Sequence, residues 1–144
     1  HTAIRRQRQM CIRDRSRSVS AISLLVPDYN AGIAFYVGKL GFTLVEDTPL
    51  EAGKRWVLVS PDDGAQTRPL LAKAADDAQQ AAIGNQAGGR VFLFLKTDDF
   101  DTDHERFTAA GVRFLETPRE EAYGKVAVFE DPFGNKWDLI QNRS

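Results

Sequence analysis

The stretch that decides the fold is Asp131–Leu139, which reads DPFGNKWDL and predicts a tight turn followed by a strand. Pro132 fixes one backbone torsion, whereas Gly134 and Asn135 tolerate the positive φ values that a sharp reversal requires. The last strand of the chain is therefore expected at residues 136–141, directly behind this turn.

The elements that precede this strand occur twice, at an offset of 70 residues. Asp28 corresponds to Asp98 and Gly41 to Gly111, so each half has a helix-capping aspartate and a glycine that ends the helix. In the second half Asp98 and Asp99 are equally good caps. Strands are expected at residues 19–26, 42–45, 55–60, 70–73, 91–95, 112–115, 125–130 and 136–141.

Two βαβββ modules follow from this repeat, and each is too small to close a hydrophobic core alone. We expect an α+β fold with a first module at 19–75, a linker at 76–89 and a second module at 90–141. Each helix should cover one face of its mixed sheet and leave the other concave, so that together the sheets form a barrel-like cavity. Whether the modules close within one chain or exchange between two chains stays open.

Composition and charge exclude several classes of protein. The chain has 144 residues, a net charge of −1 and a single cysteine, Cys11, so no internal disulfide can form. No apolar run reaches the ~20 residues that span a bilayer, so neither a membrane protein nor a membrane partner is expected, and we predict a cytoplasmic protein. Residues 1–18 hold six arginines and one acid and predict a disordered basic leader, either native or appended. The remainder is acidic and would repel nucleic acid.

Three segments together resemble the vicinal oxygen chelate superfamily, which includes glyoxalase I, extradiol dioxygenases, fosfomycin-modifying enzymes and bleomycin-resistance proteins. These segments are residues 25–42, residues 109–112 and the run from Tyr123-Gly124 to residues 131–139. The resemblance covers about residues 19–141. It implies the paired-module fold described above and a homodimer, because members of this superfamily are commonly dimeric.

The resemblance also implies a divalent metal bound on the concave faces, and the expected ligand positions can be checked. They fall at Ala21, at Val91 or Phe92, within residues 70–73 and at Asp138. Asp138 is the one potential ligand among them, and divalent first-row metals need three or four. We therefore predict no cofactor, with a divalent metal as the alternative. His104 is expected to face solvent, and Cys11 in the leader is not expected to be a catalytic thiol.

Asp138 is the leading candidate for a functional group. It shares a strand face with Lys136, whereas Trp137 lies on the opposite face. The resemblance implies that Asp138 faces the cavity and that Trp137 packs beneath a helix. A carboxylate facing the cavity could act as a general base or bind a cationic ligand. The alternative is a salt bridge to Lys136, Lys96 or Arg90.

Further candidates for ligand contact come from other strands and from the charged loop at 116–124. Trp56 could stack on a flat ligand or pack in the core. Arg119 could bind an anion or pair with Glu120 or Glu121, and Tyr123 offers a hydroxyl. The full set of candidate ligand-binding residues is Trp56, Arg90, Phe92, Arg119, Tyr123 and Asp138.

Three functions remain in competition. The first is a metal-independent small-molecule-binding protein of the bleomycin-resistance type, with its ligand in the concave cavity. The second is a lyase, isomerase or dioxygenase that uses a divalent metal or Asp138 as a base. The third is an interaction module whose cavity is filled by its own aromatic side chains, namely Trp56, Phe92, Phe94 and Phe129.

Overall fold

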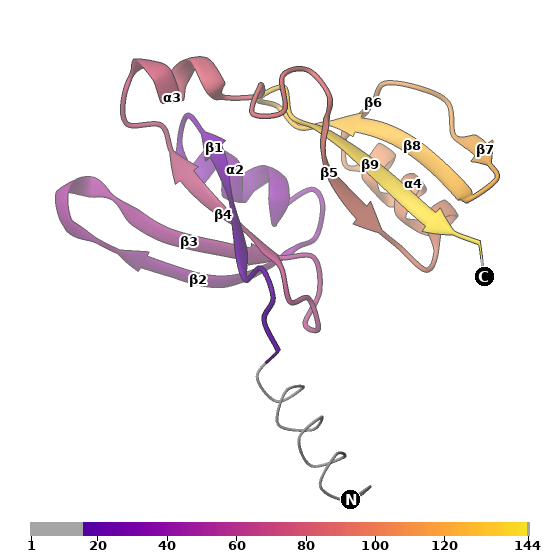
Figure 1. The fold of residues 1–144 in the computed structure, drawn as a ribbon, viewed down its shortest axis with the longest axis horizontal. Helices are drawn as coiled ribbons and strands as arrows, with labels where there is room; N and C mark the ends of the chain where they lie inside the picture. Colours follow the sequence, from indigo (N-terminus) through magenta and orange to yellow (C-terminus); the bar gives the residue numbers. More distant parts are fainter. Residues whose placement is uncertain (1–15, 144) are drawn as a thin grey trace, which may run out of the picture.

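A computed structural model describes residues 16–143 and contains two mixed sheets (Figure 1). Sheet A has the strand order β1-β4-β3-β2. It is mixed, because β1 runs parallel to β4 whereas β3 runs antiparallel to β4. Its elements are β1 (Ala21–Val26), α2 (Tyr29–Tyr36), β2 (Thr43–Pro49), η1 (Glu51–Gly53), β3 (Arg55–Ser60) and β4 (Arg68–Lys73).

Sheet B repeats this plan with the order β5-β9-β8-β6, and β7 pairs with β8 beside that path. The strands β5 and β9 run parallel, whereas β8 and β9 run antiparallel. Its elements are β5 (Val91–Lys96), α4 (Phe100–Ala109), β6 (Arg113–Phe114), β7 (Arg119–Glu121), β8 (Gly124–Glu130) and β9 (Lys136–Asn142). The predicted α+β class with two mixed sheets is confirmed.

Aspartate caps begin both long helices, as the sequence predicts. The Asp28 carboxylate accepts a hydrogen bond from the Ala31 amide at 2.9 Å. In the second half the cap is Asp99, which accepts from the amide and the hydroxyl of Thr102 at 3.3 and 2.8 Å. Helix α2 ends at Tyr36, before the glycine at Gly41, because residues 37–40 form a turn instead.

Three short elements were not expected from the sequence. The segment that we expected to be a linker contains the helix α3 (Asp77–Ala82), which Asp76 caps by accepting from the Gln79 amide. The strand β7 lies in the expected charged loop, and η1 lies in the turn between β2 and β3. The proposed module boundaries stay a prediction; within the described residues, sheet A uses residues 21–73 and sheet B residues 91–142.

The turn before β9 differs from the expectation at one residue. Gly134 has a φ of +105°, as predicted, but Asn135 is not among the residues with positive φ. The Asn135 side chain is buried and donates to the Asp131 carboxylate at 2.7 Å. Asp131 also accepts from the amides of Phe133 and Asn135, so it is the carboxylate that holds the turn together.

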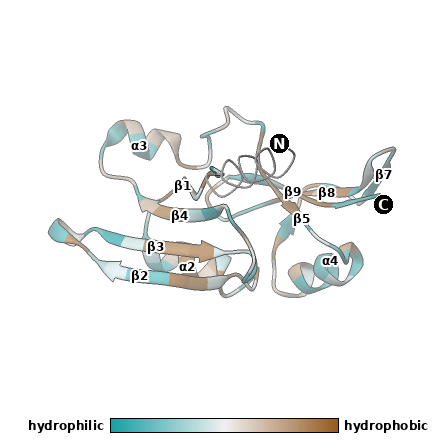
Figure 2. Ribbon diagram, turned by 60° about the horizontal axis from the view of Figure 1, so that its bottom comes forward, coloured by the Kyte–Doolittle hydropathy of each residue, from teal (hydrophilic) through white to brown (hydrophobic). Residues whose placement is uncertain are grey.

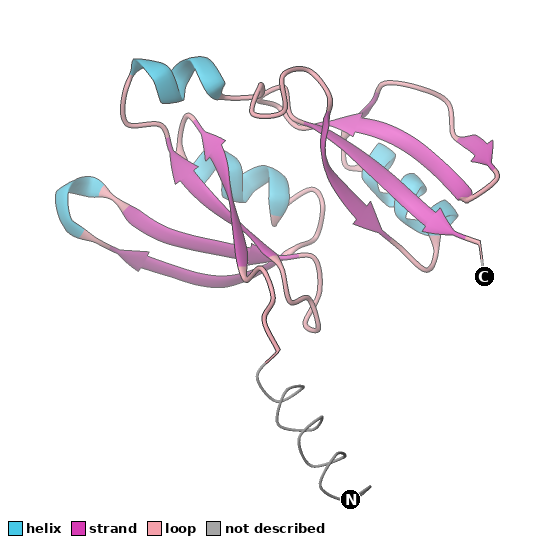
Figure 3. Ribbon diagram, in the orientation of Figure 1, coloured by secondary structure: helices cyan, strands magenta, loops and turns pink. Residues whose placement is uncertain are grey.

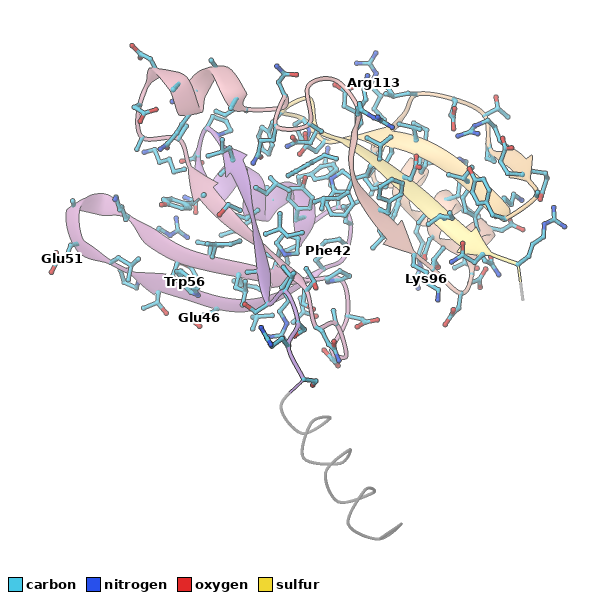
Figure 4. All side chains as sticks on the ribbon, in the orientation of Figure 1. Phe42, Glu46, Glu51, Trp56, Lys96 and Arg113 are labelled. Atoms are coloured by element: carbon cyan, nitrogen blue, oxygen red, sulfur yellow. The ribbon has the colours of Figure 1, made fainter. Side chains whose placement is uncertain are left out.

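One hydrophobic core is shared by both modules. The rings of Tyr36 and Phe42 lie 5.7 and 6.0 Å from the ring of Trp137, which is stacked on Phe129 at 5.9 Å. Figure 4 shows Phe42 between the two halves of the molecule. Figure 2 shows hydrophobic residues on β3 and β5, whereas α4 is largely hydrophilic on its exposed side.

A buried pair of hydrogen bonds fastens the two modules to each other. The Tyr36 hydroxyl on α2 donates to the Asp131 carboxylate at 2.5 Å, and Trp137 Nε1 donates to the Tyr36 oxygen at 3.1 Å. Burial raises the pKa of Tyr36 well above its usual value, and the neighbouring Asp131 raises it further. We call Tyr36, Asp131 and Trp137 the latch.

Within the described residues the two sheets form no closed barrel. The modules meet through α2 and the helix-covered face of β9, where the latch lies. Figure 3 shows α2 and α4 behind their sheets, so the opposite face of each sheet is left uncovered by these helices. We call these uncovered faces open face A and open face B.

Residues 1–15 lie outside the described part of the chain, and with them Cys11 and most of the predicted leader. Residues 16–18 are exposed and belong to no helix or strand. Between residues 16 and 143, none of the helices combines the length and the hydrophobicity needed to cross a bilayer.

Candidate ligand-binding site

Strand β9 separates the core from open face B. Trp137 and Leu139 are almost fully buried on the side that α4 covers, where the Gln141 side chain accepts from the Phe100 amide. Because side chains alternate along a strand, Asp138 projects from open face B. This is the orientation that the sequence predicts for Trp137 and Asp138.

One carboxylate oxygen of Asp138 receives no hydrogen bond. Its Oδ1 is buried and makes no hydrogen bond, and the ion pairs found among residues 16–143 do not include it. Burial raises the pKa of the Asp138 carboxyl; the Arg119 charge opposes this shift and the Glu116 charge adds to it. The salt bridge to Lys136 is not formed, because that ammonium donates to the Gly89 carbonyl at 3.1 Å.

Arg119 is held by two carboxylates rather than being free to bind an anion. Its Nε lies 2.9 Å from Glu116 and its terminal nitrogen 2.7 Å from Glu121. These hydrogen bonds raise the pKa of the guanidinium further above its ordinary value. Glu116 also accepts from the amide of Val128, the residue that pairs with Asp138 across β8 and β9. Glu116 and Arg119 therefore border Asp138 on open face B.

Phe94 supplies an exposed aromatic ring beside Asp138. The two residues are partners across β5 and β9, and 64% of Phe94 is exposed. The candidate Phe92 is instead partly buried against the core. The cause is a register shift between Val91 and Leu93, which changes the alternation along β5 and could not be read from the sequence.

Trp56 lies on open face A rather than in the core. It is 40% exposed on β3 and pairs with Thr48 of β2, next to Glu46 (Figure 4). Neither Trp56 nor Phe94 is buried, so these two rings do not fill the interior as the interaction-module hypothesis requires.

The other two candidates lie away from Asp138. Arg90 is exposed just before β5, and Tyr123 is 52% exposed in the turn between β7 and β8. Gly124, next to Tyr123, pairs with Asn142, four residues beyond Asp138 on β9. At about 3.3 Å per residue, that is roughly 13 Å from Asp138. The structure thus brings Asp138 and Arg119 together and leaves Trp56, Arg90 and Tyr123 apart from them.

Glu116 and Phe94 are the neighbours that our candidate set omitted. Phe94 could have been found from its alternation with Leu93 and Leu95, had the pairing of β5 with β9 been known. The signal for Glu116 was weaker, because its place depends on two contacts. One is the ion pair with Arg119 in the charged loop, and the other is the hydrogen bond from the amide of Val128 on β8.

The positions where the resemblance implies metal ligands can be located in the structure. Ala21 occupies the expected position on β1, and Asp138 is a single carboxylate. Across residues 16–143, no three His, Cys, Asp or Glu side chains gather closely enough to hold a metal ion. His104 is half-buried between the rings of Phe100 and Phe114, at 5.7 and 4.3 Å, so the expectation that it faces solvent is wrong.

Comparisons with known proteins agree with this architecture. The family model of the Glyoxalase/Bleomycin resistance protein/Dioxygenase superfamily matches residues 18–139. An uncharacterised protein of Shewanella frigidimarina (strain NCIMB 400) is 53% identical over 126 residues, which cover 87% of this chain and 93% of that protein.

Two solved structures are similar both in sequence and in fold. One is described as TnmS3, an antibiotic binding protein from Streptomyces sp. CB03234; it is 32% identical with a TM-score of 0.72, over 89% of this chain and 98% of that one. The other is a glyoxalase/bleomycin resistance protein from the same strain, 34% identical with a TM-score of 0.67, over 86% of this chain and 100% of that one.

Proposed function

We propose that this chain, which belongs to the Glyoxalase/Bleomycin resistance protein/Dioxygenase superfamily, binds a small organic molecule on open face B. The ligand lies against Phe94 and Asp138, and binding needs no metal. A similar protein of known structure is described as antibiotic binding, which supports the binding of a small molecule over catalysis.

The observation that carries this proposal is the unpaired Asp138 oxygen beside an exposed aromatic ring. A buried acceptor without a donor costs roughly 1–3 kcal/mol, which a ligand donor would recover. The Phe94 ring offers a flat apolar surface for stacking. The ligand that fits both features is a flat aromatic molecule that carries a hydrogen-bond donor or a positive charge.

A homodimer would complete the site. One chain leaves Phe94 on open face B and Trp56 on open face A exposed, and large aromatic side chains are usually covered. A second copy that sets its open face A over open face B of the first would bring Trp56 opposite Phe94. Such an arrangement would enclose a ligand between two rings. Location in the cytoplasm stays a prediction.

Metal independence rests on the chemistry of the donors. Around Asp138 the nearest charged groups, Glu116 and Arg119, are bound to each other, so the Glu116 carboxylate is already engaged by a cation. The neighbouring face positions hold Phe94 and Val128, which offer no ligand atoms.

A titration with 9-aminoacridine, a flat aromatic cation, tests the proposal. We expect saturable binding that is unchanged by EDTA and at least about tenfold weaker in Asp138→Asn, a loss of about 1.4 kcal/mol. The matched control is Asp101→Asn, because the Asp101 carboxylate is exposed on α4, on the other side of sheet B. Equal affinity in Asp138→Asn and the parent chain, or loss of binding in EDTA, would overturn the proposal.

The second candidate is an enzyme in which Asp138 acts as a base, and the raised pKa of its carboxyl favours it. Incubation with Ni, Zn, Mn or Fe(II) salts, desalting and elemental analysis separate the two. About one metal ion per chain, lost in Asp138→Ala, would favour the enzyme.

A further inference from the structure

An apolar pocket lies between the two sheets, apart from the site around Asp138. Its volume is about 270 Å³. Its walls include Ile22 and Pro69 from sheet A and Phe92, Leu93, Leu95 and Trp137 from sheet B. Both modules therefore contribute, and neither could form this pocket alone.

The pocket exists because two edge strands face each other without pairing. β1 is the edge of sheet A and β5 the edge of sheet B. Beside Ser23 and Leu25 the gap is closed by Gln86, whose amide accepts from the Leu25 nitrogen and donates to the Ser23 carbonyl at 2.8 and 3.0 Å. Next to Ile22 no such side chain intervenes, and the pocket occupies that part of the gap.

This pocket is not part of the site around Asp138. Ile22 alternates in phase with Leu24, which is fully buried on the helix-covered side of β1. Leu93 and Leu95 likewise pair with Trp137 and Leu139 on the helix-covered side of sheet B. Phe94 borders the pocket from open face B, so the two sites share one wall and lie on opposite sides of β5.

The polar side chains in the wall, those of Thr67 and Trp137, already make hydrogen bonds. The Thr67 hydroxyl donates to the Val19 carbonyl at 2.6 Å, and Trp137 Nε1 donates to the Tyr36 oxygen at 3.1 Å. A charged group placed among these apolar side chains would lose part of its hydration without gaining a hydrogen bond from a side chain of the wall. A dry apolar cavity of about 150 Å³ already accommodates benzene.

From these features we infer that the pocket between β1 and β5 is a binding site for a small uncharged hydrocarbon group, such as a single aromatic ring. Its occupant touches Ile22 and Pro69 of one module and Phe92 and Trp137 of the other. Binding therefore stabilises the junction of the modules as well as the folded chain. This inference stands apart from the proposed function, because it concerns the opposite side of β5.

Fluorescence of Trp137 with toluene as the probe tests the inference. The chain has two tryptophans, so Trp56→Phe leaves Trp137, in the pocket wall, as the reporter. In that background we expect a saturable change of emission with toluene. Adding Ile22→Phe fills the pocket and should weaken binding at least about tenfold, whereas Leu44→Phe adds the same bulk on the exposed strand β2 and should not. A response that is linear, or equal in the Ile22→Phe protein, would overturn the inference.

A second measurement needs no filled variant, in case Ile22→Phe fails to fold. Methyl NMR of the Trp56→Phe chain labelled at isoleucine should show toluene shifting the Ile22 signal. Ile140 lies in phase with Asp138 on β9 and serves as the internal control for open face B. A shift of Ile140 without Ile22 would place toluene on open face B and refute the pocket.

Discussion

Replacement of Tyr36 by phenylalanine removes one hydroxyl from the latch and is expected to be strongly destabilising. The Tyr36 hydroxyl donates to the Asp131 carboxylate and accepts from Trp137 Nε1, and all three residues are buried. A hydrogen bond to a charged group contributes about 1.5–3 kcal/mol, and a buried donor left unpaired costs about 1–3 kcal/mol.

The two effects together predict a loss of about 3–5 kcal/mol in the free energy of unfolding. The loss should not be larger, because Asp131 keeps the amides of Phe133 and Asn135 and the Asn135 side chain as donors. Both aromatic rings and their packing on Phe42 are retained, so little apolar contact disappears.

Urea unfolding followed by far-UV circular dichroism measures this change. The slope of the free energy of unfolding against urea concentration should be the same in both proteins, because the same surface is exposed on unfolding. Tyr123→Phe is the matched control, because the Tyr123 ring is exposed in a turn; it should change stability by less than about 0.5 kcal/mol. If Tyr36→Phe cost less than about 1 kcal/mol, the argument that the latch joins the two modules would be refuted.

Three further predictions concern pH and backbone geometry. The pKa of Tyr36 is raised in the folded state, so its contribution to stability is full below about pH 10, the unfolded value, and is lost as pH rises beyond it; alkaline urea titrations of the parent chain should show this loss and those of Tyr36→Phe should not. The pKa of Asp138 is also raised, so its contribution to stability is full below about pH 4 and is lost as pH rises through the folded value. Asp138→Asn should therefore gain stability relative to the parent chain between pH 4 and pH 7. Equal slopes of the free energy of unfolding against pH in the two proteins would contradict this. Gly124→Ala should destabilise the protein by more than about 3 kcal/mol, because φ is +154° and a Cβ would collide with the Gln141 carbonyl. Gly53→Ala is the control, because a Cβ there has open space at φ +75°; it should cost about 1 kcal/mol in thermal or urea unfolding.

Local signals in the sequence predicted most of the fold. The strand at residues 55–60 and both aspartate caps are where the pattern indicates, because alternation and capping depend on neighbouring residues. Alternation placed Trp137 and Asp138 on opposite faces of the strand, and the resemblance to the superfamily indicated which of them packs beneath the helix. The failures involve residues that are distant in sequence. The hydrogen bond that joins the modules links Tyr36 to Asp131, 95 residues away, and no local pattern reports that contact.

The candidate site was predicted less well than the fold. Asp138 was singled out because it stands where the resemblance places the last metal ligand, but Phe92 was chosen where Phe94 is exposed. The irregularity between Val91 and Leu93 takes Phe92 out of the alternation that Phe94 keeps, and it arises in the pairing of β5 with β9 rather than in β5 itself. The ion pair of Arg119 with Glu121 was among the alternatives predicted from the sequence, whereas its second partner, Glu116, depends on the fold of the loop.

The side chain of Gln86 has a consequence for how the protein behaves in a crowded solution. By presenting one carbonyl and one N–H to β1, it imitates a neighbouring strand with a single amide. An unprotected edge is a template on which other chains add strands and aggregate. Gln86→Ala would bare that template while leaving the shared core intact, so its main effect would be self-association that grows with protein concentration.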